Sequence, residues 1–146
     1  MRDATHAPVD AAYVLGRLEE AGATLLTIPG TGHSPRMYIG GLDCVHSAIE
    51  AYGWTEVAIR PAAPSPRHID EMDEALTWLQ LIPNARHVLR RIVGARMLVH
   101  PVTGRHLFSW RRVGRMIGAD HKAAERWHAQ GIDVIALNLR AQNYLI

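Results

Sequence analysis

Apolar residues recur every three or four positions along most of this chain, which is the period of an amphipathic α-helix. Segments rich in proline and glycine interrupt the pattern and predict loops, the longest of them over residues 29–41. Because almost every patterned segment has the helical period, the sequence predicts an all-α fold. The predicted helices cover residues 9–22, 42–52 and 84–99, together with a helix that begins at Ser65-Pro66 and ends at Pro83.

The segment from residue 109 to residue 130, SWRRVGRMIGADHKAAERWHAQ, carries the clearest local signals. Ser109 is a good helix N-cap, and three apolar residues with spacing i, i+3, i+7 follow it on one helical face. Gly118 can end this short helix because glycine adopts positive φ without strain, and Asp120 can cap the next helix. The segment therefore predicts two helices joined by a tight turn.

Two helices joined by a short, glycine-containing turn are typical of the helix-turn-helix motif. In that motif the second helix enters the DNA major groove and the first helix crosses the backbone. An ordinary corner between two helices, with a solvated basic face, is the alternative. The residue types favour DNA, since arginine neutralises phosphates and lysine, arginine and glutamine hydrogen-bond to base edges. The sequence thus predicts phosphate contacts from Ser109, Arg111, Arg112 and Arg115, and base contacts from His121, Lys122, Arg126 and Gln130.

Charge is divided unevenly along the chain, although the formal net charge is only +2. Residues 1–83 hold 5 arginines against 11 acidic residues, a net −6, whereas residues 84–146 hold 11 basic against 3 acidic residues, a net +8. Such asymmetry favours a nucleic-acid surface on the basic side, although the halves could also pair with each other. We interpret 1–83 as an acidic helical segment for partner or oligomer contacts and 84–146 as a helix-turn-helix DNA-binding domain, packed as one unit. The arginines of the helix predicted over 84–99 are expected to face largely outward: Arg86, Arg90, Arg91 and Arg96.

The C-terminal residues 132–146 are strongly apolar, and their apolar side chains lie on more than one helical face. A terminal helix of one small domain need not bury so much apolar surface. This helix either runs between the two halves of the chain or supplies a homodimer interface. A homodimer would double the set of DNA contacts, and the sequence leaves both interpretations open.

Three segments resemble a family of uncharacterised helix-turn-helix proteins carried by bacterial prophages. They are AYGWTEVAIRPAAPSP at 51–66, IDEMDEALTWL at 69–79, and RRIVGARM with FSWRRVGRMIG within 90–118. The stretch from Trp110 is also similar to the helix-turn-helix of sigma-factor region four. The resemblance implies a DNA-binding role in phage genetics. This chain differs from the family in the second helix of the motif, where it has His121, Ala123 and Glu125.

Other candidate chemistry has simpler explanations. The nine histidines and Cys44 include no set of four ligands with the paired spacing of a zinc site, so no metal or other cofactor is expected. His121 and His128 could instead contact phosphate, more strongly when protonated. The glycine-rich segment 29–36 lacks the Gly-Lys-Ser/Thr ending of a phosphate-binding loop. No catalytic constellation remains, and we do not expect an enzyme.

These observations favour a phage-type transcription regulator that binds specific double-stranded DNA, with RNA polymerase or another protein as partner of the acidic half. A single cysteine and the absence of a long apolar run predict a cytoplasmic protein without a membrane span. Two other functions stay open. One is a small terminase subunit that recognises viral DNA for packaging, and the other is a helical protein-interaction module.

Overall fold

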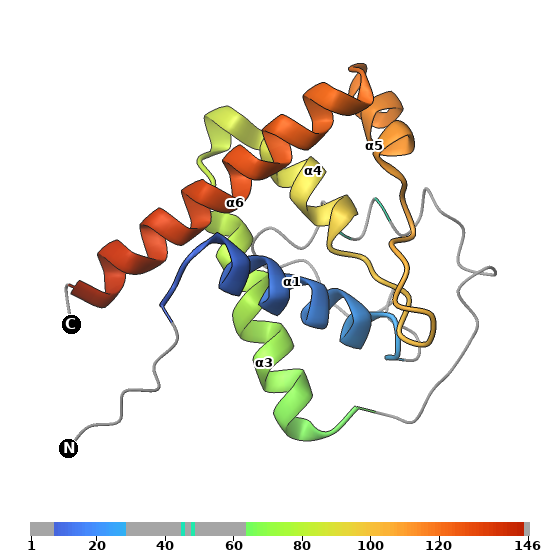
Figure 1. Cartoon of the computed structure of the whole chain (residues 1–146). Helices are drawn as coiled ribbons and strands as arrows, with labels where there is room; N and C mark the ends of the chain where they lie inside the picture. Colours follow the sequence, from blue (N-terminus) through green and yellow to red (C-terminus); the bar gives the residue numbers. More distant parts are fainter. Residues whose placement is uncertain (1–7, 29–44, 46–47, 49–63, 145–146) are drawn as a thin grey trace.

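The computed structural model describes residues 8–28, 45, 48 and 64–144, and these residues form helices joined by short connections (Figure 1). The described part contains no strand, only an isolated antiparallel bridge between Val99 and His106, so the predicted all-α class is confirmed. The helices are α1 (Ala11–Leu25), α3 (Pro66–Thr77), α4 (His87–Arg96), α5 (Trp110–Ile117) and α6 (His121–Tyr144), with 3-10 turns η4 (Trp78–Leu81) and η5 (Asn84–Arg86).

Two other predictions fall mainly on residues that the structure leaves undescribed. The loop predicted over 29–41 lies outside the described residues. So does the helix predicted over 42–52, except for Val45 and Ala48, which are helical and buried. Among the helices that are described, none is long and apolar enough to cross a membrane.

Side-chain caps fix where α1 and α3 begin. Asp10 Oδ1 accepts a hydrogen bond from the Tyr13 backbone N–H at 2.9 Å, and Ser65 Oγ accepts one from the His68 N–H at 3.2 Å. Each bond satisfies a backbone donor that has no partner inside the helix. The predicted start at Ser65-Pro66 is confirmed, with Pro66 in the first helical position, where its missing N–H costs nothing.

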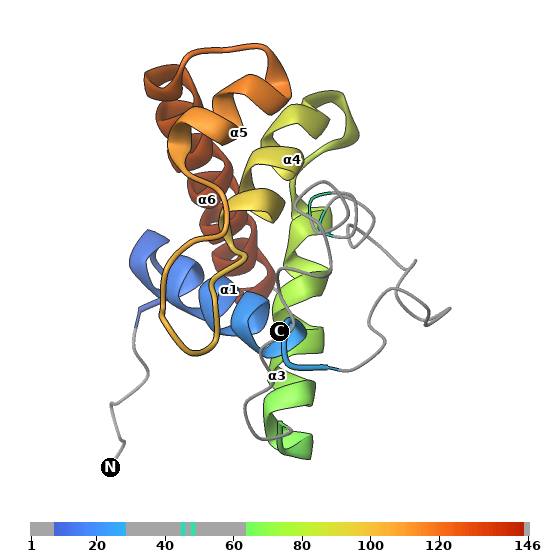
Figure 2. The same cartoon turned by 90° about the vertical axis from the view of Figure 1, so that its right-hand side faces the viewer.

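Helices α1 and α3 pack against each other, and the long α6 lies across α4 at one end and α1 at the other (Figures 1 and 2). One continuous hydrophobic core fills the space between them, so the prediction that the two halves pack as one unit is confirmed. The largest fully buried side chains come from both halves of the sequence: Leu18, Leu25, Leu79, Ile82, Ile92, Met97, Leu98, Phe108 and Ile135.

The apolar C-terminal segment does not form a helix of its own, because α6 continues without a break from His121 to Tyr144. Ile132 and Ile135 are buried, and α6 contacts α1, α4 and η4. Asn138 also donates a hydrogen bond to the Leu81 carbonyl at 2.9 Å. The helix therefore runs between the two halves of the chain, which is one of the two predicted roles. On the outer face of α6, Leu137 remains 60% exposed.

Candidate nucleic-acid interface

The turn between α5 and α6 has the local geometry that the sequence predicts. Ser109 Oγ accepts a hydrogen bond from the Arg112 N–H at 3.2 Å and starts α5. Gly118 ends it with φ +72° and ψ +33°, a left-handed conformation that favours glycine. Asp120 Oδ1 accepts a bond from the Ala123 N–H at 2.7 Å and starts α6. The conformation of Gly118 thus fixes where α5 ends, and the side chain of Asp120 fixes where α6 begins.

Gly114 determines how closely α5 approaches this turn, a role that the sequence analysis missed. A β-carbon at Gly114 would lie 2.6 Å from the Ala119 carbonyl oxygen, closer than real contacts allow. The Ala119 N–H donates to the Gly114 carbonyl at 2.8 Å. Val113, Ala123 and other small or apolar side chains are buried between the two helices. The only signal in the sequence was an unexplained glycine in the middle of a predicted helix.

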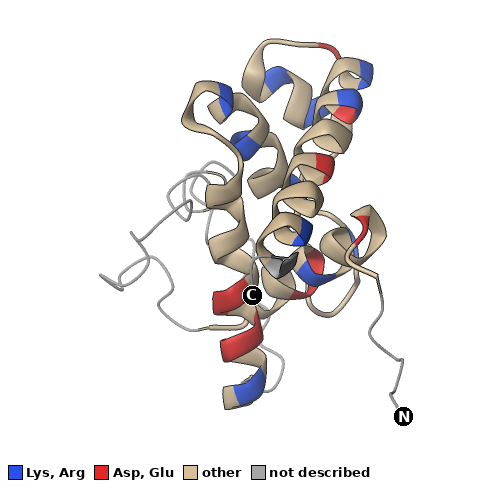
Figure 3. Cartoon of the chain, turned by 90° about the vertical axis from the view of Figure 1, so that its left-hand side faces the viewer, with Lys and Arg blue, Asp and Glu red and all other residues tan. Residues whose placement is uncertain are grey.

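Exposed cations surround the turn. Arg111 and Arg115 project from α5, and Lys122 and Arg126 from the first turns of α6; all four are exposed. Across the segments that the structure describes, no acidic side chain forms an ion pair with any of them. Figure 3 shows several basic positions on α4, α5 and the start of α6, with others nearer the middle of the molecule and on α3, whereas the acidic residues of α3 lie toward the other end. Four predicted site cations are thus exposed on the two helices that flank the turn.

The other predicted site residues are less available. Ser109 is exposed, but its hydroxyl caps α5. Arg112 is half-buried, with its guanidinium carbon 5.0 Å from the centre of the Phe108 ring, and His121 is half-buried as well. Gln130 is exposed but accepts a hydrogen bond from Arg86 Nη2 at 3.2 Å. The set predicted from sequence therefore divides into four open cations and four residues with structural contacts or partial burial.

The charge of α6 is lower than its basic residues suggest. Its exposed surface carries Glu125 and Asp133 as well as Lys122 and Arg126, so these four charges cancel. By contrast, α5 has three arginines and no acidic residue. Arg91 adds to this side, because its exposed side chain donates to the Met116 carbonyl at the end of α5 at 3.2 Å. A polyanion would therefore be attracted mainly by α5.

Partly buried aromatic and basic side chains support α5 from behind. Arg96 lies 4.1 Å from the centre of the Trp110 ring and donates to the Phe108 carbonyl at 2.8 Å. The outward orientation predicted for Arg96 is wrong, because this cation–π contact and hydrogen bond hold it against the protein. The Trp110 ring also meets the His128 ring edge to face, with centres 5.1 Å apart. Trp110 is thus held between α4 and α6.

His128 packs inside the protein and does not face solvent, so the phosphate contact predicted from it is wrong. The residue is only 8% exposed, because it lies on the face of α6 that packs against Trp110. Burial lowers the His128 pKa from 6.5 to about 4, and the positive charges of Arg96 and His106 act in the same direction. The imidazole is therefore neutral at pH 7. No group of three or more potential metal ligands occurs among the described residues.

Removal of the cap at the start of α6 should destabilise the corner. We expect Asp120→Ala to lower the free energy of unfolding by about 1 kcal/mol, because the Ala123 N–H loses its acceptor. Asp133→Ala, which removes an exposed carboxylate from the middle of the same helix, is the matched control and should change stability by less than about 0.5 kcal/mol. Urea unfolding followed by circular dichroism measures both. Equal losses in the two variants would show that the cap is not formed in solution.

Comparison with known proteins gives one match. The model of a family described as a domain of unknown function (DUF6362) matches residues 42–135, which include α3, α4, α5, the turn and the first half of α6. No curated protein and no solved structure matches the chain.

Proposed function

The chain belongs to the DUF6362 family, and from this premise we propose that it binds specific double-stranded DNA as a transcription regulator, with α5, the turn and the start of α6 as a helix-turn-helix motif. The family description carries no activity, so the proposal depends on the surface itself. One observation carries it: four exposed cations, without acidic partners among the described residues, surround a tight turn between two helices. Like charges clustered on one surface repel one another, and a bound polyanion relieves this repulsion.

The shape of the corner supports contact with the major groove. Helix α6 rises about 1.5 Å per residue, so the stretch from His121 to Gln130 covers about 14 Å, comparable with the width of the groove. Beyond it, one face of α6 packs against α1 and η4, and the exposed surface of α6 carries fewer cations. The stretch from His121 to Gln130 is therefore the part of α6 that would read bases, as the second helix of the motif does.

We assign different roles to the two helices because their charges differ. Arg111 and Arg115 on α5 would hold phosphates, with Arg112 beside them. On α6, Lys122 and Arg126 are suited to guanine, and Glu125 between them is suited to the amino group of cytosine. The carboxylate would also repel phosphate, which weakens nonspecific binding more than specific binding. His121 and Gln130 would add base contacts only after giving up part of their present packing or their hydrogen bond to Arg86.

The test is DNA binding by the full chain. A duplex selected from a random library would be used in fluorescence anisotropy at several salt concentrations, beside an unrelated duplex of equal length. We expect tighter binding to the selected duplex, and weaker binding to both as salt rises, because released counterions favour the complex. Failure to select any duplex, or binding that does not change with salt, would overturn the proposal.

Charge reversal on α5 locates the interface. The double variant Arg111→Glu with Arg115→Glu should lose about 30-fold in affinity, and the slope of log K against log salt should fall by about 2 as two phosphate contacts are lost. The control makes the same charge change elsewhere, at Arg67 at the start of α3 and Arg105 on the loop before α5, both exposed. If the two double variants lose affinity equally, net charge alone governs binding. Unchanged affinity in the α5 variant would instead favour a basic surface for an acidic protein.

A further inference from the structure

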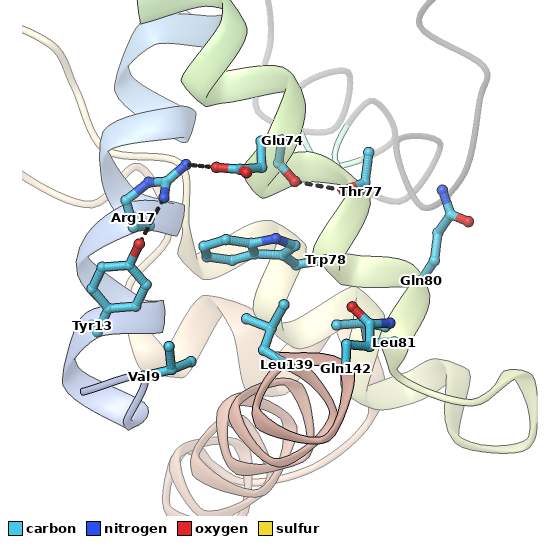
Figure 4. A pocket seen from close by; sticks show the side chains of 10 residues that line it. All are labelled: Val9, Tyr13, Arg17, Glu74, Thr77, Trp78, Gln80, Leu81, Leu139 and Gln142. Atoms are coloured by element: carbon cyan, nitrogen blue, oxygen red, sulfur yellow. Dashed lines mark hydrogen bonds and ion pairs between the residues drawn. The ribbon is translucent and has the colours of Figure 1, made fainter. Parts of the chain in front are cut away.

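A pocket of about 540 Å³ lies at the far end of α6 from the turn, where α6 meets the start of α1 and the end of α3 (Figure 4). Its volume is typical of sites for small organic ligands. Arg140 Nη1 donates to the Val9 carbonyl at 2.7 Å and ties the start of α1 to α6 beside the pocket. Asn138 ties α6 to the end of η4 in the same way. The walls therefore come from four elements that the fold holds together, namely α1, α3, η4 and α6.

The upper wall of the pocket, as drawn in Figure 4, is a fixed ion pair. Arg17 Nη2 lies 2.6 Å from Glu74 Oε1, and the same guanidinium donates to Tyr13 Oη at 3.0 Å. Its central carbon lies 4.8 Å from the centre of the Trp78 ring. These contacts leave the guanidinium little capacity for a ligand. Glu74 is 61% exposed, and its Oε2 has no hydrogen bond within the described residues, so this oxygen remains open as an acceptor.

The floor of the pocket contains a donor that has no partner among the described residues. Trp78 is only 8% exposed, with Arg17 on one side of its ring and Leu139 on the other (Figure 4). No described residue accepts a hydrogen bond from its indole N–H. A buried indole N–H normally finds an acceptor, because losing water without replacement costs free energy. In this pocket a ligand atom can supply the acceptor.

The remaining lining is apolar on one side and neutral polar on the other. Leu81 and Leu139 offer carbon surface, whereas Gln80 and Gln142 carry exposed side-chain amides, each able to donate and to accept. The two charges in the walls, Arg17 and Glu74, neutralise each other. A carboxylate ligand would be repelled by Glu74 and the acidic residues of α3, and an ammonium ligand would approach Arg17. The walls therefore favour a neutral ligand.

We propose that this pocket binds a neutral amide attached to an apolar group. Its carbonyl oxygen would accept from Trp78 Nε1, its N–H would donate to Glu74 Oε2, and its carbon atoms would cover Leu81 and Leu139. A free small amide and an uncharged peptide segment share this chemistry. The inference does not depend on DNA binding, since it concerns other residues at the opposite end of α6.

The experiment titrates full-length protein with N-acetyl-leucinamide while recording the indole N–H signals by NMR. The Trp78 signal is identified by its loss in Trp78→Phe. We expect that signal to move downfield and saturate, with a dissociation constant on the order of millimolar for so small a probe. N-acetyl-leucine, which has the same shape but a carboxylate, should bind at least about tenfold more weakly. The capped peptide acetyl-Ala-Leu-Ala-amide separates the two sources: tighter binding than the small amide indicates a peptide segment, and equal or weaker binding a small molecule.

Two variants test the assigned contact. Trp78→Phe keeps an aromatic ring and removes the donor, and should weaken binding about tenfold, the value of one hydrogen bond. Because this variant has no Trp78 signal, its affinity is measured from the backbone amide signals of α6 residues beside the pocket, and the same signals are followed in the wild type. Trp127→Phe removes an indole N–H from the first half of α6, away from the pocket, and should leave affinity unchanged. Unfolding midpoints of both variants report whether the fold is retained. No saturable change of the Trp78 signal with either amide, or equal affinity in Trp78→Phe, would overturn the proposal. The proposal would also be overturned if the Trp78 indole N–H were already protected from solvent exchange before any probe is added, because the donor would then have a partner in the free protein.

Discussion

Replacement of Gly22 by alanine is expected to lower the free energy of unfolding by about 4 kcal/mol. A β-carbon at this position of α1 would lie 2.0 Å from the Met97 carbonyl oxygen and 2.7 Å from its carbonyl carbon. Overpacking usually costs about 1–3 kcal/mol because side chains rotate away. Here both neighbours are backbone atoms, which cannot rotate away, so α1 must move away from the segment after α4. That movement would also loosen Leu18 and Leu25, which are fully buried.

Gly16→Ala is the matched control, because it makes the same substitution in the same helix. Gly16 is exposed, and a β-carbon at this position would have no neighbouring segment within 4 Å. Alanine should therefore raise the free energy of unfolding by about 1 kcal/mol through its better helix propensity. In urea unfolding, the free energy of unfolding should therefore fall in Gly22→Ala and rise in Gly16→Ala. Two changes of the same sign would contradict the close contact between α1 and Met97.

The contrast between these glycines shows which parts of the fold could be predicted from the sequence. The turn of the candidate interface could be predicted because its signals are local: Ser109, Gly118 and Asp120 each act within three residues of their own position. Gly22 acts on Met97, far along the chain, and nothing near either residue indicates the contact. Only the packing of α1 against the segment after α4 gives this glycine its role.

The availability of the candidate site residues depended on tertiary structure in the same way. The sequence identified residue types that bind DNA, but it did not reveal that Arg86 pairs with Gln130 or that Arg96 stacks on Trp110. Long basic side chains often pack their stems or guanidinium groups on nearby apolar surface, and a helical pattern does not indicate when they do so. Partial burial and structural hydrogen bonds together reduce the eight candidates to four open cations.

The division of charge also has a different meaning in three dimensions. The acidic and basic ranges share one core, and His106 Nε2 lies 3.4 Å from Glu19 across the boundary. Arg17 forms an ion pair with Glu74, which also belongs to the acidic half. The basic surface near α5 is therefore not neutralised by the acidic residues of α3, which lie toward the other end of the molecule (Figure 3). Because of this separation, the protein has a basic surface near α5 although its formal net charge is only +2.

Stability is expected to fall by about 3 kcal/mol between pH 6.5 and pH 4 through His128 alone. In the unfolded chain this histidine takes up a proton near its ordinary pKa of 6.5, whereas burial lowers its pKa in the folded protein to about 4. The unfolded state therefore binds the proton first as the pH falls. The stabilisation is complete above pH 6.5 and is lost progressively down to pH 4.

The His128→Leu variant isolates this contribution, because the other histidines titrate in both proteins. The wild type should lose about 3 kcal/mol relative to the variant as the pH falls from 7 to 4, measured by urea unfolding at each pH. His87→Leu, at the exposed start of α4, controls for the loss of one histidine from the chain. A constant difference between wild type and His128→Leu would contradict the buried position. Since His128 packs on Trp110 and Trp110 belongs to α5, the same acid range should also weaken the surface proposed to bind DNA.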